Sequence, residues 1–518
     1  MTTETSIYEY AKRGLTLSAD RPAIWFYGKS ITYRELFEKI DNVAEHLLDL
    51  GVREGTVVSV HLPNCPQAVM AIYAVAKLGG ICNMIHALTP LKGVQENMRF
   101  TKSRILLTYM PECESAAEKT VAVDVSDYMG LLYKTGYRLT SKQPNCSCRF
   151  SDFEKSCEKK AQIPEPASLA EKPVAYFSSS GTTGEPKTVV HCHRAINNSA
   201  ENMIEYFDWH DFSDEIVLSE LPTFHGFGFV GNLHVVLRGG GLVVQLARWD
   251  RLFAAKIIDR LSITMMAGVP KVFSDLLTVE HFSGKSLSQC FIAGDSVPTK
   301  IKKEFISRVG KKNLYEAYGM TEIVAACCAC NEKKNRIEAS GYPINNCRVS
   351  ILRNGEIFPS GEGELLVLTN TMMLGYLNET NPEKPSYYFF NDGLSWMRTG
   401  DVGKIDEEGF VYCEGRIKDV IIFHGYLVFP KQLERLALEI DVIHNVCVVG
   451  KKDSDNSVYK IIAYIESEQN SDLVCKMVEQ KWKEVLPAYA VPSIIHVLRE
   501  FPHNDMGKID KVKLESML

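Results

Sequence analysis

The sequence predicts an α/β protein with more than one domain, and three observations support this fold class. The chain has 518 residues, which is more than one ordinary hydrophobic core accommodates. Patterns typical of buried strands and of amphipathic helices alternate along its N-terminal part, as expected for a parallel sheet with helical crossovers. Near the C-terminus a shorter run of strands and one amphipathic helix predicts a smaller, compact α+β unit.

The first elements have clear signals. Residues 31–51 predict a helix, because Thr32-Tyr-Arg-Glu35 is a capping-box pattern and apolar residues follow it at helical spacing. Residues 56–60 predict a buried strand, and residues 68–78 predict a second helix that a glycine pair ends. The charged stretch 113–172 has weaker signals and is interpreted as peripheral structure and a linker.

Later elements continue the alternation. Strands are predicted at 174–177, 215–219, 262–268, 291–294, 361–367, 446–449 and 459–464, and a helix at 472–485. His191 and His193 are interpreted as the start of the helix that follows the loop after residue 177, rather than as a metal site. Residues 406–412 predict an ordinary hairpin.

Composition excludes several functions. The net charge is −6 with no basic tail or stripe, so no nucleic-acid partner is expected. The first residues lack the basic and then apolar pattern of a signal peptide. No apolar run reaches about 18 residues, so no membrane span is expected. These features predict a cytoplasmic protein.

Cysteine usage agrees with a reducing compartment. The chain has 15 cysteines, an odd number that suits buried thiols better than a disulfide framework. The run Cys327-Cys-Ala-Cys330 follows an apolar segment and has no second Cys/His pair at zinc-finger spacing. It is interpreted as a packed strand.

A segment rich in hydroxyl groups is the main candidate for chemistry. After the strand at 174–177 come seven consecutive residues that are small or carry hydroxyls, and Lys187 follows them. The seven are Ser178, Ser179, Ser180, Gly181, Thr182, Thr183 and Gly184. Glycines permit close backbone approach, hydroxyls donate hydrogen bonds and the lysine adds positive charge, so the segment predicts a phosphate-binding loop.

This loop differs from the common P-loop. Counting from Gly181, the P-loop pattern requires a glycine where this chain has Pro186. Proline offers no N–H to a phosphate and does not continue a helix, so the segment is expected to stay a loop. The alternative is a surface linker, which is less compatible with the preceding strand and the Pro-Lys ending.

The segment resembles the phosphate-binding signature of the adenylate-forming superfamily, which includes acyl- and aryl-CoA ligases, amino-acid adenylation domains and luciferases. Further motif matches follow in the family's order near residues 222, 318, 363, 400, 416, 487 and 508. The resemblance spans almost the whole chain. It implies a large N-terminal domain of layered sheets flanked by helices, residues 1–415, and a small mobile C-terminal domain, residues 416–518.

The motif around residue 318 is expected to hold the nucleotide. Tyr318 suits stacking on adenine, and Gly319 suits close approach of substrate. Thr321 offers a hydroxyl to the α-phosphate, and Glu322 offers a hard oxygen ligand for Mg²⁺.

Other nucleotide contacts come from separate motifs. The resemblance places Asp401 on the ribose hydroxyls and Arg416 on the ribose or a phosphate. It also places Gly294 and Asp295 along the adenine and acyl pocket. Asp295 stands where the family more often has a small residue, and its role is open.

The resemblance places His225 beside the acyl pocket. No Asp or Glu lies between Pro222 and Gly231, whereas amino-acid-activating relatives place a carboxylate near the substrate amine. A buried, uncompensated ammonium is costly, so a free amino acid is disfavoured as substrate. Glycines and phenylalanines at 226–229 suggest an apolar pocket that is wide at the glycines. The alternative is that His225 is a core histidine.

Three further residues belong to the C-terminal part. By resemblance, Lys418 is the hinge residue, Gly425 lines the tunnel for CoA, and Lys508 is the catalytic lysine of the first half-reaction. Lys508 follows a glycine, on an expected mobile loop.

The implied function is an ATP-dependent, AMP-forming acid:CoA ligase with ATP, Mg²⁺ and CoA as cofactors and co-substrates. A fatty or aromatic acid is activated as acyl-adenylate and then transferred to the CoA thiol. Three alternatives remain: a free-standing ligase that loads a carrier protein, a non-catalytic nucleotide-binding relative, and a luciferase-type oxygenase.

Overall fold

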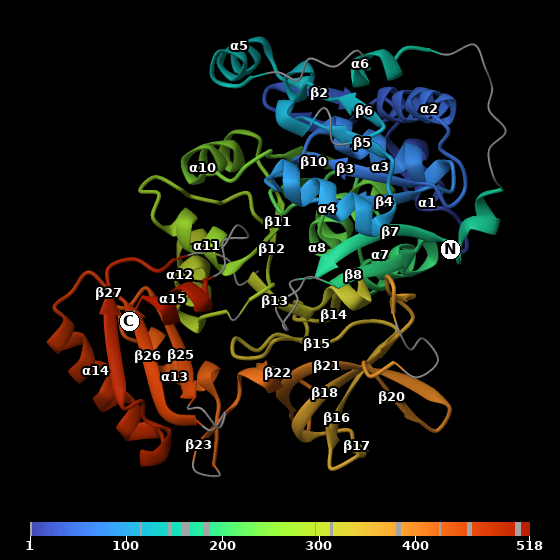
Figure 1. Ribbon diagram of the computed structural model, residues 1–518. Coiled ribbons are helices and arrows are strands. Elements are labelled where there is room, and N and C mark those ends of the chain that lie inside the picture. Colours follow the sequence, from blue (N-terminus) through green and yellow to red (C-terminus); the bar gives the residue numbers. More distant parts are fainter. Residues whose placement is uncertain are drawn as a thin grey trace.

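The computed structural model describes residues 3–113, 117–142, 148–156, 165–179, 187–295, 297–310, 314–379, 385–423, 426–452, 458–502 and 509–517. Figure 1 shows a large N-terminal body and a smaller C-terminal unit beside it. Both are built from sheets with helices against them, which confirms the predicted fold class.

Sheet A is the larger sheet of the N-terminal body, with strand order β15-β14-β13-β12-β11-β9-β10-β1-β2. Neighbours from β13 to β1 are parallel, and β2, β14 and β15 pair antiparallel at its ends. The strands are β1 (Pro22–Phe26), β2 (Lys29–Thr32), β9 (Ile216–Ser219), β10 (Leu242–Gln245), β11 (Met265–Gly268), β12 (Gln289–Ile292), β13 (Leu314–Gly319), β14 (Ala326–Ala329) and β15 (Tyr342–Pro343).

Sheet B lies beside sheet A and has the order β19-β8-β7-β4-β3-β5-β6. The pairs from β7 to β6 are parallel, whereas β8 is antiparallel to both β7 and β19. The strands are β3 (Val57–His61), β4 (Ile81–Met84), β5 (Ile105–Thr108), β6 (Lys119–Ala122), β7 (Pro173–Ser179), β8 (Lys187–Cys192) and β19 (Gly375–Tyr376).

Sheets C and D complete the architecture. Sheet C is antiparallel and contains β16 (Cys347–Arg353), β17 (Glu356–Phe358), β18 (Gly361–Thr369), β20 (Tyr388–Asn391), β21 (Leu394–Ile405) and β22 (Val411–Arg416). Sheet D belongs to the C-terminal unit and contains β23 (Ile421–Phe423), β24 (Tyr426–Val428), β25 (Asn445–Lys452), β26 (Val458–Glu466) and β27 (Ile494–Leu498).

Helices cover the sheets. In the N-terminal body they are α1 (Ile7–Ser18), α2 (Tyr33–Asp49), α3 (Pro66–Lys77), α4 (Leu91–Thr101), α5 (Leu131–Thr140), α6 (Phe150–Phe153), α7 (His193–Phe207), α8 (Gly226–Phe229), α9 (Val235–Gly239), α10 (Arg251–Arg260), α11 (Pro270–Leu277) and α12 (Thr299–Val309). The C-terminal unit has α13 (Pro430–Leu438), α14 (Ser471–Val485) and α15 (Lys511–Ser516). None of the described helices is both long and apolar enough to cross a bilayer.

The main hydrophobic core lies between sheets A and B, with α3 at its centre. All residues from Pro66 to Ala76 are buried, which explains why this helix has little polar face. A second core lies between sheet A and the helices α10, α11 and α12, and a third lies within the C-terminal unit. The capping box at Thr32 is present as predicted, and most of the Cys327–Cys330 run lies in the buried strand β14.

Candidate active site

The predicted phosphate-binding loop joins the antiparallel strands β7 and β8. Ser178 and Ser179 end β7, Lys187 begins β8, and residues 180–186 lie outside the described residues. Ser179 pairs with Lys187 across the strands, and its hydroxyl donates to the Lys187 carbonyl at 3.2 Å. The interpretation of His191 as a helix start was wrong, because the chain returns as a strand and α7 begins only at His193.

Lys187 and Glu322 both contact the side chain of one tyrosine, Tyr376. The Lys187 ammonium nitrogen lies 4.6 Å from the centroid of the Tyr376 ring. The hydroxyl of Tyr376 donates to Glu322 Oε1 at 2.7 Å. Tyr376 reaches this place because β19 pairs with β8. The structure therefore brings the lysine of the loop and the predicted magnesium ligand to one place, through a residue that the sequence analysis missed.

A buried histidine anchors the segment that carries Thr321. His191 Nε2 donates to the Thr321 carbonyl at 2.7 Å. Burial lowers the pKa of His191 to about 4, so the ring is neutral at pH 7 and its single proton is on Nε2. This contact fixes the position of the backbone from which the side chains of Thr321 and Glu322 extend.

A strained turn follows Glu322. Val324 has φ 72° and ψ −56°, and the Ala325 N–H donates to the Ile323 carbonyl across it at 3.0 Å. This is a γ-turn in the positive-φ form, which is rare and costs about 1–3 kcal/mol for a β-branched residue. The turn directs the chain from the Thr321–Glu322 segment back into β14.

The predicted adenine and ribose residues form one connected group. Tyr318 donates its hydroxyl to Asp401 Oδ2 at 2.5 Å, and Arg416 Nε lies 2.8 Å from Asp401 Oδ1. Burial raises the pKa of Asp401, and the Arg416 guanidinium opposes that rise. Arg416 also donates to the Thr399 carbonyl at 2.9 Å, so β13, β21 and β22 converge on one carboxylate.

Two motifs of sheet C hold this group in place. Arg398 lies in the Arg398–Asp401 motif and forms a two-nitrogen contact with Glu364, which lies in the motif at 361–367. Arg398 Nε donates to Glu364 Oε1 at 3.2 Å, and the terminal nitrogen donates to Oε2 at 2.7 Å. Such bidentate pairs fix orientation as well as distance. The role of Arg398 is therefore structural within the motif that carries Asp401.

Gly319 is needed by the protein's own backbone. A Cβ at this position would lie 1.8 Å from the Ala325 carbonyl oxygen. Gly319 was expected to make room for substrate. The structure gives a second reason for glycine here, because the chain that follows the γ-turn passes close to it.

The acyl side of the predicted site differs from expectation at its glycines. A Cβ on Gly226 would lie 1.9 Å from the Val324 carbonyl oxygen, and one on Gly228 would lie 2.3 Å from the Pro222 carbonyl oxygen. The prediction that the pocket is wide at these glycines was wrong, because backbone from neighbouring segments fills that space. Phe229 is likewise fully buried in the main core.

His225 lies immediately before α8, next to an aromatic contact. Phe224 lies 4.6 Å from His86 and 5.9 Å from His225, measured between ring centroids. His86 follows β4 in sheet B and accepts from the Leu88 N–H at 3.1 Å. The sequence analysis missed His86, which carries no motif of its own and reaches the site only because sheets A and B face each other.

Comparisons with known proteins decide the family. The AMP-binding enzyme profile matches residues 12–377, well over half of the chain, and the profile of the AMP-binding enzyme C-terminal domain matches residues 432–508. The chain belongs to the AMP-binding enzyme family. The predicted resemblance to adenylate-forming enzymes is thereby confirmed.

Individual relatives of this AMP-binding enzyme are distant and full-length. A long-chain-fatty-acid–CoA ligase of Bacillus subtilis is 28% identical, over 96% of this chain and 91% of its own length. A 2-succinylbenzoate–CoA ligase of Bacillus cytotoxicus is 26% identical, over 97% of both chains.

Solved structures share the fold. An anthranilate CoA ligase in complex with anthranoyl-AMP has a TM-score of 0.85 at 22% identity, covering 100% of this chain and 98% of that chain. An O-succinylbenzoate coenzyme A synthetase of Bacillus subtilis in complex with ATP and a magnesium ion has a TM-score of 0.81 at 23% identity, covering 98% of this chain and 99% of that chain.

The C-terminal unit of this AMP-binding enzyme touches the predicted site directly. Lys431 of α13 lies 3.7 Å from Asp295, at the carboxyl end of β12, and 3.3 Å from Glu434. A second contact joins Lys300 of α12 to Asp441 at 2.9 Å. Asp295, whose role the sequence left open, thus has a partner in the C-terminal unit. The sequence analysis did not identify this partner, Lys431.

The remaining predicted residues divide into two groups. Gly294 has φ 87°, a left-handed conformation that favours glycine, and Lys418 lies in a short 3-10 helix next to Asp419, which pairs with Lys511 at 3.2 Å. Gly425 and Lys508 lie outside the described residues, so their roles stay predictions.

Proposed function

We propose that the protein is an ATP-dependent, AMP-forming acid:CoA ligase that acts on a fatty or aromatic acid. The observation that carries this proposal is the convergence of five separated segments on two small groups. One group is Lys187, Tyr376 and Glu322, and the other is Tyr318, Asp401 and Arg416. The first suits the phosphates of ATP, and the second suits its nucleoside.

In the first half-reaction an oxygen of the substrate carboxylate attacks the α-phosphorus of ATP. The bond from that phosphorus to the bridging oxygen breaks, and pyrophosphate leaves. Such reactions depend on positioning and on neutralisation of charge rather than on covalent help from the protein. Lys187 and the hydroxyl-rich loop are proposed to hold the β- and γ-phosphates, and Lys508 to lie between the two approaching oxyanions.

The donor set suits magnesium. Glu322 supplies a carboxylate whose Oε1 the Tyr376 hydroxyl orients, and a carboxylate with phosphate oxygens is the usual environment of Mg²⁺. When bound, Mg²⁺ neutralises charge on the phosphates. The Thr321 hydroxyl is proposed to contact the α-phosphate, with its backbone fixed by His191.

In the second half-reaction the sulfur of CoA attacks the acyl carbon. The bond between acyl carbon and phosphate oxygen breaks, and AMP leaves. Rotation of residues 416–518 about Lys418 is proposed to remove Lys508 and to bring Gly425 to the tunnel of the pantetheine arm.

The acyl side supports an uncharged substrate tail. No acidic residue lies between Pro222 and Gly231, and the nearest carboxyl before them is Glu220. Burial raises the pKa of Glu220 to about 8. A fatty or aromatic acid is favoured over an amino acid. A reducing, cytoplasmic location is proposed because the described cysteines are free thiols.

Pyrophosphate release tests the proposal directly. Purified protein with ATP and Mg²⁺ is given a panel of fatty, aromatic and amino acids, and thioester formation is then followed with CoA. Release with fatty or aromatic acids and transfer to CoA are expected. Adenylation without transfer to CoA would favour a ligase for a carrier protein, and no pyrophosphate with any acid would favour a non-catalytic relative. Light emission with oxygen would indicate a luciferase-type reaction.

A further inference from the structure

Helix α5 carries its leucines on the outside. Leu131, Leu132 and Leu139 are 83%, 82% and 81% exposed, and no residue of α5 is buried. With Thr135 they form one face of the helix, since their spacing of three, four and seven residues returns to the same side. Ordinary surface helices place such leucines against the core, so this leucine face is the reverse of the usual arrangement.

The opposite face of α5 is held by polar and aromatic contacts. Lys134 lies 3.1 Å from Asp127, and Arg138 pairs with Asp124. The Tyr133 ring contacts Tyr27 at 5.6 Å and Phe253 at 5.8 Å. These contacts fix the helix on the body with the leucine face turned outward.

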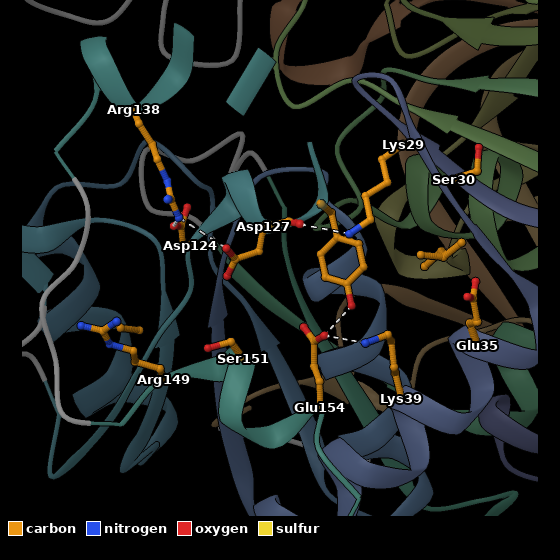
Figure 2. Close-up of a pocket in the computed structure, with 13 residues that line it drawn as sticks. Lys29, Ser30, Glu35, Lys39, Asp124, Asp127, Arg138, Arg149, Ser151 and Glu154 are labelled. Atoms are coloured by element: carbon orange, nitrogen blue, oxygen red, sulfur yellow. Dashed lines mark hydrogen bonds and ion pairs between the residues drawn. The ribbon is translucent and has the colours of Figure 1, made fainter. Parts of the chain in front are cut away.

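The inner side of α5 borders a polar cavity of about 680 Å³ (Figure 2). Lys39 and Tyr128 both donate to Glu154 there, and Arg138 reaches Asp124 from α5. None of the predicted active-site residues that the structure describes lines this cavity. Because the cavity is lined mainly by charged and polar side chains, it is not a place where the leucines of α5 would be buried.

Exposed cations lie just beyond α5 in the sequence. Residues 128–151 include Lys134, Arg138, Lys142 and Arg149, of which Lys134 and Arg138 are paired with Asp127 and Asp124. Lys142 and Arg149 are exposed. Figure 1 shows α5 at the outer edge of the N-terminal body, away from the C-terminal unit.

We propose that α5 docks the protein on an anionic lipid bilayer, with the leucine face inserted among the lipids and the flanking cations against their headgroups. Apolar residues on one face and Lys or Arg beside them are the features by which a helix lies in a membrane interface. Positive charge near the surface adds to the binding. One face of a ten-residue helix is smaller than the roughly 800 Å² per partner of a standard protein interface, whereas a helix can lie in a membrane interface by itself.

This surface has a consequence that rests on the proposed function. A long-chain acid partitions into bilayers, so a docked enzyme would meet its substrate there. The docking itself is independent of which acid is activated, because α5 shares no residue with the proposed active site.

Flotation with lipid vesicles tests the inference. The full chain is mixed with vesicles of phosphatidylcholine alone or of three parts phosphatidylcholine to one part phosphatidylglycerol. We expect binding to the anionic vesicles that high salt weakens. The variant Leu131→Ser/Leu132→Ser/Leu139→Ser should bind the anionic vesicles at least about tenfold more weakly than the unaltered chain. The matched control Leu17→Ser/Leu473→Ser/Val485→Ser removes three other exposed apolar side chains and should bind as the unaltered chain does.

A charge variant keeps the test valid if the leucine variant misfolds. Lys142→Glu/Arg149→Glu leaves the leucines in place and should lose binding to anionic vesicles. Pyrophosphate release with a short, water-soluble acid should be unchanged in both variants, which separates this inference from the proposed function. No binding of the unaltered chain to anionic vesicles would overturn the inference. Self-association of the unaltered chain that the serine variant abolishes would also overturn it, in favour of an interface between two copies.

Discussion

At the level of single residues, the Tyr376 hydroxyl is the contact that joins the loop lysine to the predicted magnesium ligand. Tyr376→Phe keeps the ring beneath Lys187 and removes only the donor to Glu322. A hydrogen bond to a charged group contributes about 1.5–3 kcal/mol. We therefore expect pyrophosphate release to slow about tenfold to a hundredfold, with a higher magnesium concentration needed for half-maximal rate.

The matched control for this change is Tyr388→Phe. The Tyr388 hydroxyl donates to the Met373 carbonyl instead of to Glu322. Both variants should fold equally well, so a rate loss confined to Tyr376→Phe identifies the carboxylate contact. Equal rates for both variants would contradict the role given to Tyr376.

Glu220 predicts a dependence of stability on pH. Its Oε1 is buried without a hydrogen-bond partner among the described residues, and burial raises its pKa from 4.5 to about 8. Because the folded state keeps this proton longer than the unfolded state, the stabilisation is complete below pH 4.5. It is lost as the pH rises from 4.5 to about 8.

Glu220→Gln removes this titration. We expect the free energy of unfolding of the variant to rise relative to that of the unaltered chain between pH 5 and pH 8, by at most about 1.4 kcal/mol per pH unit. Urea denaturation at several pH values measures the difference. Glu280→Gln, at an exposed position, should show a constant difference. A constant difference for Glu220→Gln as well would mean that the carboxyl ionises as freely as in the unfolded chain.

At the level of elements, α8 depends on glycines that allow it to approach other backbone. Gly226→Ala would place a Cβ 1.9 Å from the carbonyl oxygen of Val324, the residue at the centre of the γ-turn. Backbone does not yield as a side chain does, so we expect a loss of about 3 kcal/mol or more and slower pyrophosphate release. Thermal unfolding and the rate assay together check both effects.

The control is Gly231, three residues after Gly228. A Cβ on Gly231 would lie 3.6 Å from the Phe227 ring, an ordinary contact distance. Gly231→Ala should therefore change stability and rate little. A loss as large as that of Gly226→Ala would mean that the helix tolerates no side chain there for another reason.

The elements themselves were largely predictable, because their signals are local. The capping box of α2, the buried strand β3 and the apolar helix α3 appear as expected. The pairing of β7 with β8 was not predicted. A strand, a polar loop and a lysine fit a hairpin as well as a turn into a helix, and only partners from the rest of sheet B decide between them.

Residue types at the site were predictable for the same reason, whereas their contacts were not. Asp401 and Tyr318 lie in recognisable motifs, and the structure brings them together. Tyr376 and His191 reach the site through strand pairing and burial, and nothing in their immediate sequence distinguishes them. The wide pocket inferred from Gly226 failed because a glycine marks close approach without saying what approaches.

At the level of the whole molecule, two ion pairs among the described residues connect the N-terminal body with the C-terminal unit. Lys431 contacts Asp295, and Lys300 contacts Asp441, whose side chain is 92% exposed. The side chains of Lys431 and Asp295 are 32% and 48% exposed, so both pairs are partly open to solvent and are weakened by salt. The division at residues 415 and 416 stays a prediction, and such weak joining is compatible with rotation about Lys418.

Lys508 tests that rotation most directly. If Lys508 serves only the first half-reaction, Lys508→Ala should reduce adenylation by more than about a hundredfold. The loss of a charge that bridges two oxyanions costs several kcal/mol. Transfer from a chemically prepared acyl-adenylate to CoA should continue at nearly the normal rate, because the lysine is then away from the site. Single-turnover measurements of each half-reaction separate the two effects.

The control is Lys513→Ala, at an exposed position on α15 of the same unit, which should leave both rates unchanged. An equal loss of both half-reactions in Lys508→Ala would mean that one arrangement of the two units performs all of the chemistry.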